Sequence, residues 1–140
     1  MSALIVESCG AGTSLQDAGR VGWQRFGVSP SGAMDRPALA IANALVGNSR
    51  GACALEFTLM GGVFQVKGGP LRIALAGADC ALSVGGRAVP AFTSATAGDG
   101  ETVTVGNARA GLFAYLAAGG GFATRVDLGR PTGHRNGCGR

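Results

Sequence analysis

The sequence has 140 residues, a formal net charge of +4, 46% hydrophobic residues and 14% charged residues. This length is typical of one domain that buries roughly two-thirds of its unfolded surface, and the composition excludes disorder as the state of its main part. No apolar run approaches the roughly 20 residues of a membrane-spanning helix, and the start lacks the basic region of a signal peptide. We therefore expect a cytoplasmic protein without membrane contact.

The positive charge lies mainly at the C-terminal end. Residues 1–118 contain eight Lys or Arg against seven Asp or Glu, whereas the last 22 residues contain four Arg and one Asp. The surplus is therefore not spread over a folded face. Aromatic residues, which could stack on bases, make up only 6% of the chain. Nucleic-acid binding is not expected.

The cysteines predict neither a metal site nor a disulfide framework. Cys9, Cys53, Cys80 and Cys138 contain no CxxC pair, and the chain has one histidine, so ligand spacing for zinc is missing. Without a secretory signal, disulfides are not expected. Cys53 and Cys80 are predicted to be small core residues on strands.

Glycine separates short apolar runs along the chain. It accounts for 26 residues without a fixed period, a pattern typical of many strands joined by tight turns. Polar and apolar residues alternate in some of these runs, which predicts strands with one buried face. The expected strands are residues 3–8, 22–28, 55–59, 63–67, 71–76, 81–84, 102–105 and 112–118.

One segment has helical periodicity instead. Leu39 and Ala42 begin an apolar series at helical spacing, Asp35 can cap the start, and Gly47 suits the stop. These signals predict one helix over residues 36–46. One short helix with eight or more strands predicts a mainly β fold, either a barrel or a closed sandwich.

Polar residues that could form a binding site are concentrated in the first 48 positions. A bent loop precedes the helix, and its backbone N–H groups could bind an anion or a carboxylate. An arginine there could add a forked contact to a carboxylate or phosphate. The substrate-binding candidates are Gln16, Asp17, Arg20, Asp35, Asn43 and Asn48.

Structural explanations compete with these binding roles. Asp35 can be a helix cap alone, and Asp17 with Arg20 can be an ion pair that fixes a turn. Asn43 can bond to a neighbouring loop. Glu56 lies in an apolar strand, so if it is buried it must be paired, and it is then either a rim residue or a functional one.

Familiar catalytic motifs are absent. The chain has no GxxxxGK[ST] phosphate loop and no GxSxG elbow, and its histidine, His134, lies in the Gly/Arg-rich end. Neither a P-loop nor a Ser–His triad is expected. The sequence assigns no acid, base or nucleophile.

Four blocks, in order, carry a family resemblance: TSLQDAGRVGWQRFGVSPSGAMDRPALAIANALVGN, ALEFTLMGG, LAGAD and YLAAGGGF. With the patterns QDxGRxG, GVSPSGAMD and ANxLVGN, the chain resembles the KipA/PxpC family, also called the allophanate hydrolase subunit 2 or biotin-dependent carboxyltransferase-like family. The resemblance covers residues 1–122, which we take as one domain and as the N-terminal half of the family. Residues 123–140 form a divergent tail.

The resemblance implies a cyclophilin-like β-barrel and a subunit of an ATP-dependent 5-oxoprolinase-type hydrolase that opens 5-oxoproline to glutamate. It implies partners of the KipI/PxpB type and the PxpA type, with ATP used by the complex. One alternative is a carboxyltransferase component acting on urea or allophanate-type substrates, with biotin on a partner. Another is a non-catalytic, partner-binding regulator. Both reactions act on a small amide or lactam whose oxygen must be polarised. The six candidates are then pocket or fold-critical positions.

The chain departs from the family pattern after the YLAxxGGF block. Family members continue into an LGSxST-like segment and a second, related half, whereas this chain reads LGRPTGHRNGCGR, with Arg130 at the position of the serine. We therefore expect a truncated or frameshifted relative with an incomplete barrel, inactive by itself.

Overall fold

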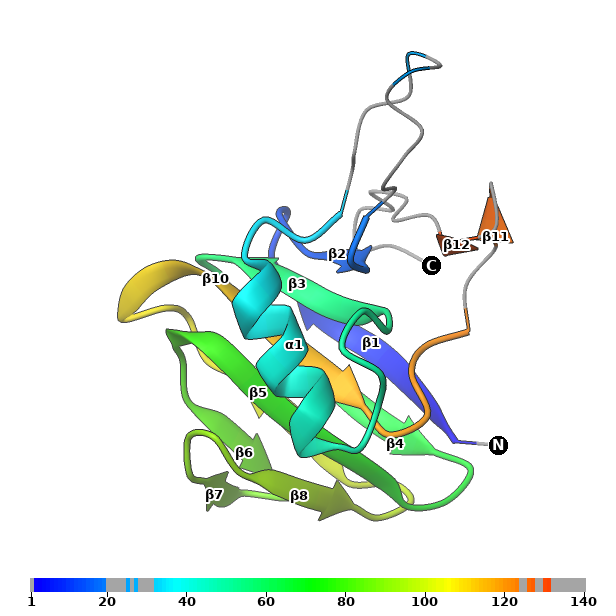
Figure 1. Cartoon of the computed structure of the whole chain (residues 1–140). Coiled ribbons are helices and arrows are strands. Elements are labelled where there is room, and N and C mark those ends of the chain that lie inside the picture. Colours follow the sequence, from blue (N-terminus) through cyan, green and yellow to red (C-terminus); the bar gives the residue numbers. More distant parts are fainter. Residues whose placement is uncertain are drawn as a thin grey trace.

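The structure, a computed structural model, describes residues 2–19, 25, 27, 32–123, 126–127 and 130–131. One helix and two five-stranded antiparallel sheets form its body (Figure 1). Sheet A has the order β1-β4-β9-β6-β7, and sheet B has the order β2-β3-β10-β5-β8. The elements are β1 (Ala3–Cys9), β2 (Ser14–Gln16), α1 (Arg36–Leu45), β3 (Ala54–Thr58), β4 (Gly62–Lys67), β5 (Leu71–Asp79), β6 (Leu82–Val84), β7 (Arg87–Val89), β8 (Ser94–Ala97), β9 (Thr102–Val105), β10 (Ala110–Ala118), β11 (Val126–Asp127) and β12 (Arg130–Pro131).

The main core lies between the two sheets. Both sheets contribute to a single cluster of buried side chains, which is dominated by Val, Leu, Ile and Phe. At its centre the rings of Phe57 in β3 and Phe64 in β4 meet edge to face, with centroids 5.9 Å apart. Such pairs add to the stabilisation from buried area.

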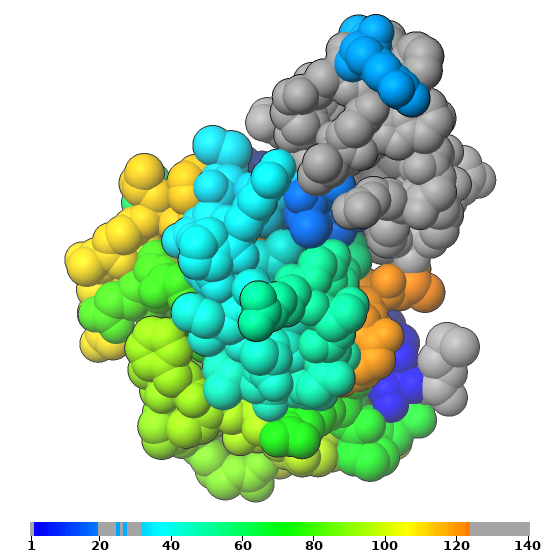
Figure 2. All heavy atoms as spheres, in the orientation of Figure 1, coloured from blue at the N-terminus to red at the C-terminus, as the bar shows by residue number. Residues whose placement is uncertain are grey.

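Alternation along the strands of sheet B creates a second core under α1. In β5, Ile73 and Leu75 belong to the core between the sheets, whereas Ala74 and Ala76 face the helix. β10 repeats this alternation, with Leu116 on one face and Ala117 on the other. Because these helix-facing alanines are small, α1 can pack closely on this part of the sheet. Figure 2 shows the other side of α1, in cyan, on the outside of the molecule.

No closed barrel is present in the described part of the chain, which corrects the expected cyclophilin-like barrel. Strands β1 and β2 follow one another in sequence but are outer strands of different sheets, and the same is true of β7 and β8. We call these places the β1–β2 seam (residues 10–13) and the β7–β8 seam (residues 90–93). Each connector turns back on itself, with Thr13 N–H donating to Gly10 O (3.1 Å) and Thr93 Oγ1 donating to Pro90 O (2.7 Å). The short strands that follow then pair with β3 and β5 instead.

The mainly β fold and the single helix are confirmed within the described residues. The helix begins at the predicted residue, Arg36, and Gly47 lies just past its end with φ +79°. Seven predicted strands match observed ones. The eighth, residues 22–28, falls almost wholly outside the described residues. Three short strands, β2, β7 and β8, were not predicted, and neither was the β11–β12 hairpin in the segment taken as a tail.

The cysteines differ in part from expectation. Cys9 is disulfide-bonded, so the expectation that the chain forms no disulfide is wrong. Cys53 is a buried free thiol directly before β3, and Cys80 is a half-buried one directly after β5. Both thus adjoin strands. In the described part of the chain, no helix is long and apolar enough to cross a membrane.

The alanine-lined contact predicts a size limit at Ala42, which is fully buried between α1 and sheet B. We expect Ala42→Leu to lower the free energy of unfolding by about 1–3 kcal/mol, because a larger side chain must displace packed backbone. Ala44→Leu, on the exposed side of the same helix, should change it by less than about 0.5 kcal/mol. Denaturant unfolding of both variants measures this, and equal losses would contradict the close packing.

Candidate functional site

A row of polar side chains crosses sheet B on the face that carries α1. Ser14 in β2 lies opposite Glu56 in β3, and Glu56 lies opposite Tyr115 in β10. The neighbouring β-strand and loop residues extend this row toward the N-terminal end of α1. We call the group the polar cluster: Ser14, Gln16, Asp17, Asp35, Glu56 and Tyr115.

The centre of the polar cluster is a buried carboxylate bound to a buried phenol. Tyr115 Oη donates to Glu56 Oε2 at 2.7 Å, and the backbone N–H of Met34 donates to the same oxygen at 3.0 Å. The backbone N–H of Asp35 donates to Tyr115 Oη at 2.8 Å. Glu56 is 5% exposed and Tyr115 is fully buried. Glu56 is thus buried and paired, as its burial requires, and it fastens the loop that enters α1.

The environment of Tyr115 keeps its hydroxyl protonated. Burial is the largest cause and raises the pKa of the phenol, because the phenolate would lose its hydration. The hydrogen bond to Glu56 and the negative charges of Glu56 and Asp35 raise the pKa further, and the bond from the backbone of Asp35 lowers it. A neutral Tyr115 can therefore act as donor to Glu56 and acceptor from Asp35 at once.

Asp35 is the N-cap of α1, as predicted. Its Oδ1 accepts from the backbone N–H of Ala38 at 3.1 Å, and Pro37 occupies the first turn. Just before it, Gly32 has φ +137°, and a Cβ there would lie 2.6 Å from the backbone N of Gly19. Only glycine fits this close approach of two loops, which aligns the chain for the cap.

Asp17 and Gln16 lie beside this entry loop. Asp17 is 6% exposed, its Oδ1 accepts from the backbone N–H of Gly19 at 2.8 Å, and its carbonyl accepts from Ala33 N–H at 2.9 Å. The half-buried Gln16 donates from Nε2 to Ser14 Oγ at 3.0 Å. Arg20, the predicted partner of Asp17, lies outside the described residues.

The remaining two candidates, Asn43 and Asn48, lie at the other end of α1. Asn43 is fully buried, and its Nδ2 donates to the carbonyls of Ala52 at 2.8 Å and Arg50 at 3.3 Å. Asn48 Nδ2 donates to Asn43 Oδ1 at 3.1 Å and to Ala118 O at 2.8 Å. These bonds tie the end of α1 to a loop and to β10. We call this group the asparagine lock, and its geometry indicates a structural role.

The six candidates therefore fall into two groups and a remainder. Three of them, Gln16, Asp17 and Asp35, belong to the polar cluster, whereas Asn43 in the last turn of α1 and Asn48 after it lie toward the other end of this ten-residue helix, which is about 15 Å long. Sequence reasoning left the role of Glu56 open and missed Tyr115. The tyrosine lies in an apolar run and is the only one in the chain, which was the available signal.

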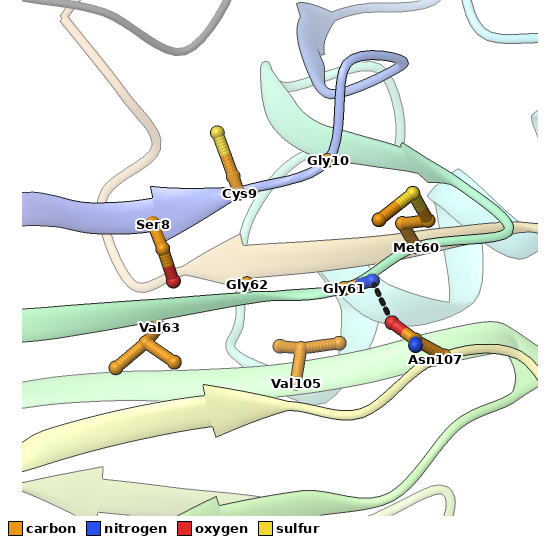
Figure 3. A pocket seen from close by; sticks show the side chains of 9 residues that line it. All are labelled: Ser8, Cys9, Gly10, Met60, Gly61, Gly62, Val63, Val105 and Asn107. Atoms are coloured by element: carbon orange, nitrogen blue, oxygen red, sulfur yellow. Dashed lines mark hydrogen bonds between the residues drawn. The ribbon is translucent and has the colours of Figure 1, made fainter.

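A shallow hollow of about 300 Å³ lies elsewhere, where β1, β4 and β9 meet (Figure 3). Its polar side chains are Ser8 and Asn107, and Asn107 Oδ1 accepts from Gly61 N–H at 3.1 Å. None of the described residues that line it is a carboxylate, a histidine or a lysine. It shares no residue with the polar cluster, and it offers no group for acid–base chemistry.

The polar cluster places hydrogen-bond acceptors next to the N-terminus of α1. The carboxylates of Asp35 and Glu56 can accept hydrogen bonds or a proton, and the amide of Gln16 can both donate and accept. Among the described residues no group of three or more His, Cys, Asp or Glu could hold a metal ion.

The asparagine lock predicts sensitivity to charge at Asn43. Asn43→Asp should lower the free energy of unfolding by about 3–5 kcal/mol, because a carboxylate oxygen would face two carbonyl oxygens away from water. Asn107→Asp is the matched control, since Asn107 is exposed and Asp keeps the acceptor for Gly61. Thermal or urea unfolding measures both, and similar small effects would refute a locking role.

The raised pKa of Tyr115 predicts a loss of stability in alkali. The unfolded phenol titrates near pH 10 and the folded one above it, so the unfolded state loses its proton first as the pH rises. The contribution of Tyr115 is thus complete below about pH 10 and falls above it. Because the chain has one tyrosine, absorbance of the phenolate reports this group alone. Ionisation near pH 10 without unfolding would contradict its burial.

The sequence of the chain is similar to those of known proteins. The family model of the carboxyltransferase domain, subdomain A and B, matches residues 26–137. The C-subunit of the Escherichia coli 5-oxoprolinase is 40% identical over 128 residues, which are 90% of this chain and 40% of that protein. The urea amidolyase of Saccharomyces cerevisiae is 36% identical over 131 residues, which are 91% of this chain and 7% of that protein.

A solved structure agrees with these sequence matches. The K. lactis urea amidolyase matches with a TM-score of 0.88 and 31% identity over 96% of this chain and 9% of that one. The chain spans less than half the length of the curated relatives it matches. Because the family model covers most of the chain and the folds agree, this protein belongs to the family of the carboxyltransferase domain, subdomain A and B, and is related to the 5-oxoprolinase C-subunit and to urea amidolyase.

Proposed function

We propose that the chain acts as a subunit of an ATP-dependent 5-oxoprolinase-type amide hydrolase, which cleaves 5-oxoproline to glutamate together with partner subunits of the KipI/PxpB and PxpA types. The observation that carries this proposal is the 40% identity to the E. coli 5-oxoprolinase C-subunit over 90% of the chain. Because the match leaves out only about a tenth of the chain, most of the elements that position the polar cluster have counterparts in that relative.

The polar cluster supports the choice of a lactam as substrate. A lactam presents one N–H donor and one carbonyl acceptor side by side, and 5-oxoproline adds a carboxylate. Gln16, which is half-buried, and Asp35, which is partly exposed, offer a donor and acceptors at the entrance of α1. The proposal assigns substrate contact to these two residues. Glu56 is buried and acts as a positioning residue, because it holds the entry loop through Met34 and Tyr115.

The proposal places ATP on a partner subunit. The chain has no GxxxxGK[ST] loop, so the usual backbone cradle and lysine for a nucleotide phosphate are missing from its sequence. This chain would then bind and orient the amide, while energy from ATP enters through another polypeptide.

A carboxyltransferase role is the second candidate. It is supported by 36% identity to the S. cerevisiae urea amidolyase and by the TM-score of 0.88 with the K. lactis protein. In this role the same acceptors would hold urea or an allophanate-type amide, and biotin would be carried by a partner. Avidin distinguishes the two roles, because it would block only the biotin-dependent reaction.

The test is reconstitution with KipI/PxpB-type and PxpA-type subunits from a bacterial 5-oxoprolinase. We expect the complex that contains this chain to consume 5-oxoproline only when ATP is present, and avidin to leave the rate unchanged. Glu56→Gln should lower kcat/KM by about tenfold or more, since the neutral amide binds Met34 and Tyr115 less firmly and loosens the entry loop.

Glu101→Gln is the matched control. Glu101 is a partly buried carboxylate that accepts from Gly98 N–H and pairs with Arg87, away from the polar cluster. It should leave kcat/KM unchanged, and a shift of the pH–rate profile in Glu56→Gln alone would separate positioning from general stability. The E. coli relative in the same assay is the positive control. If it is active and this chain binds the partners without turnover, the hydrolase proposal fails.

A further inference from the structure

The outer edge of β1 differs from the other sheet edges of the described residues. The other three outer strands of sheets A and B are short, with three residues in β2 and β7 and four in β8. β1 has seven residues, and among the strands of the described residues it pairs only with β4. Short edge strands limit unwanted pairing, whereas a long one presents a row of backbone donors and acceptors that fits another strand.

The side chains of β1 have the character of a contact surface. Ile5 and Val6 are adjacent, so they point to opposite faces of sheet A, and they are 47% and 48% exposed. Five of the seven strand residues are exposed, and Glu7 carries the only charge. The next strand in sequence, β2, belongs to the other sheet, so it does not pair with β1. The outer edge of β1 therefore carries the exposed apolar side chains of Ile5 and Val6.

Irregularity in β1 is confined to its second half. The register with β4 shifts between Val6 and Ser8, which places a bulge at Glu7. Bulges and charges are devices that keep edges from pairing. The first half, from Ala3 to Val6, has neither device. The edge available for pairing is therefore the uncharged half.

We propose that this edge binds β1 of a second copy of the chain, in antiparallel orientation, so that the two A sheets form one continuous sheet. Pairing centred at Leu4 or Ile5 opposes apolar side chains along the uncharged half. In either register, Glu7 lies away from Glu7 of the copy, so like charges do not meet. A two-fold axis uses the same edge of both copies and leaves no β1 edge free, which limits the assembly to a dimer.

The pairing needs no other partner, and its strength is expected to be modest. One strand edge with two exposed apolar residues is a small interface, and small interfaces are typical of reversible association. The inference does not depend on the proposed catalytic role, because β1 contributes no residue to the polar cluster.

The test compares Ile5→Lys with Ile41→Lys by sedimentation velocity over a range of concentrations. Ile41 is the matched control, since it is the same residue type, is 42% exposed and lies on α1. We expect the unchanged chain and Ile41→Lys to pass from monomer to a species of twice the mass as concentration rises. Ile5→Lys should raise the dissociation constant by about tenfold or more, because in either register it places a charge from each copy in the apolar half of the paired edge.

Amide hydrogen exchange of the unchanged chain gives a second readout that needs no variant. Exchange within residues 3–6 should slow as concentration rises, whereas exchange in β7 should not. A chain that stays monomeric throughout overturns the proposal. Association that survives Ile5→Lys or is abolished by Ile41→Lys also overturns it, as does concentration-independent exchange in β1.

Discussion

The close contact between α1 and sheet B determines where every other functional feature lies. Ala54 in β3, Ala74 and Ala76 in β5, and Ala117 in β10 face the helix, and the larger residues between them fill the space between the sheets. These three strands of sheet B therefore serve two cores with different size requirements. The close approach of the helix brings the backbone N–H of its N-cap, Asp35, within hydrogen-bonding reach of Tyr115.

The two ends of α1 use polar residues for different purposes. At its start, Glu56 and Tyr115 reach across from the sheet and bind backbone N–H groups of the entry loop. At its end, Asn43 and Asn48 bind carbonyls of the following loop and of β10. Buried amides with complete hydrogen bonding hold a chain in one conformation but have little capacity left for a ligand. The start of the helix, with its carboxylates, retains such capacity.

Local signals allowed the helix and seven strands to be predicted, because apolar runs, a cap residue and glycine stops act over a few neighbours. Short strands such as β2 and β7 have too few apolar residues to show a period, so only pairing with distant strands defines them. The same limit applies to the candidate site. Asp35 was identified as a cap from its neighbours, but the bond between Glu56 and Tyr115 depends on a register that joins residues 59 positions apart. The choice between a closed barrel and a sandwich likewise depends on the β1–β2 seam and the β7–β8 seam. At each seam the chain passes from one sheet to the other, so the two strands that it joins do not pair.

The two seams also have a consequence for how such a domain diverges in evolution. Hydrogen bonds fix the strands within each sheet, but contact between the sheets is apolar packing, which has no strict direction. The polar cluster, α1 and the asparagine lock all belong to sheet B and its loops. Sheet A can therefore accumulate substitutions, or change its tilt, at the cost of repacking alone and without altering hydrogen bonds at the cluster. In a domain divided in this way, sheet A can evolve new contacts with other proteins while sheet B keeps the polar cluster unchanged.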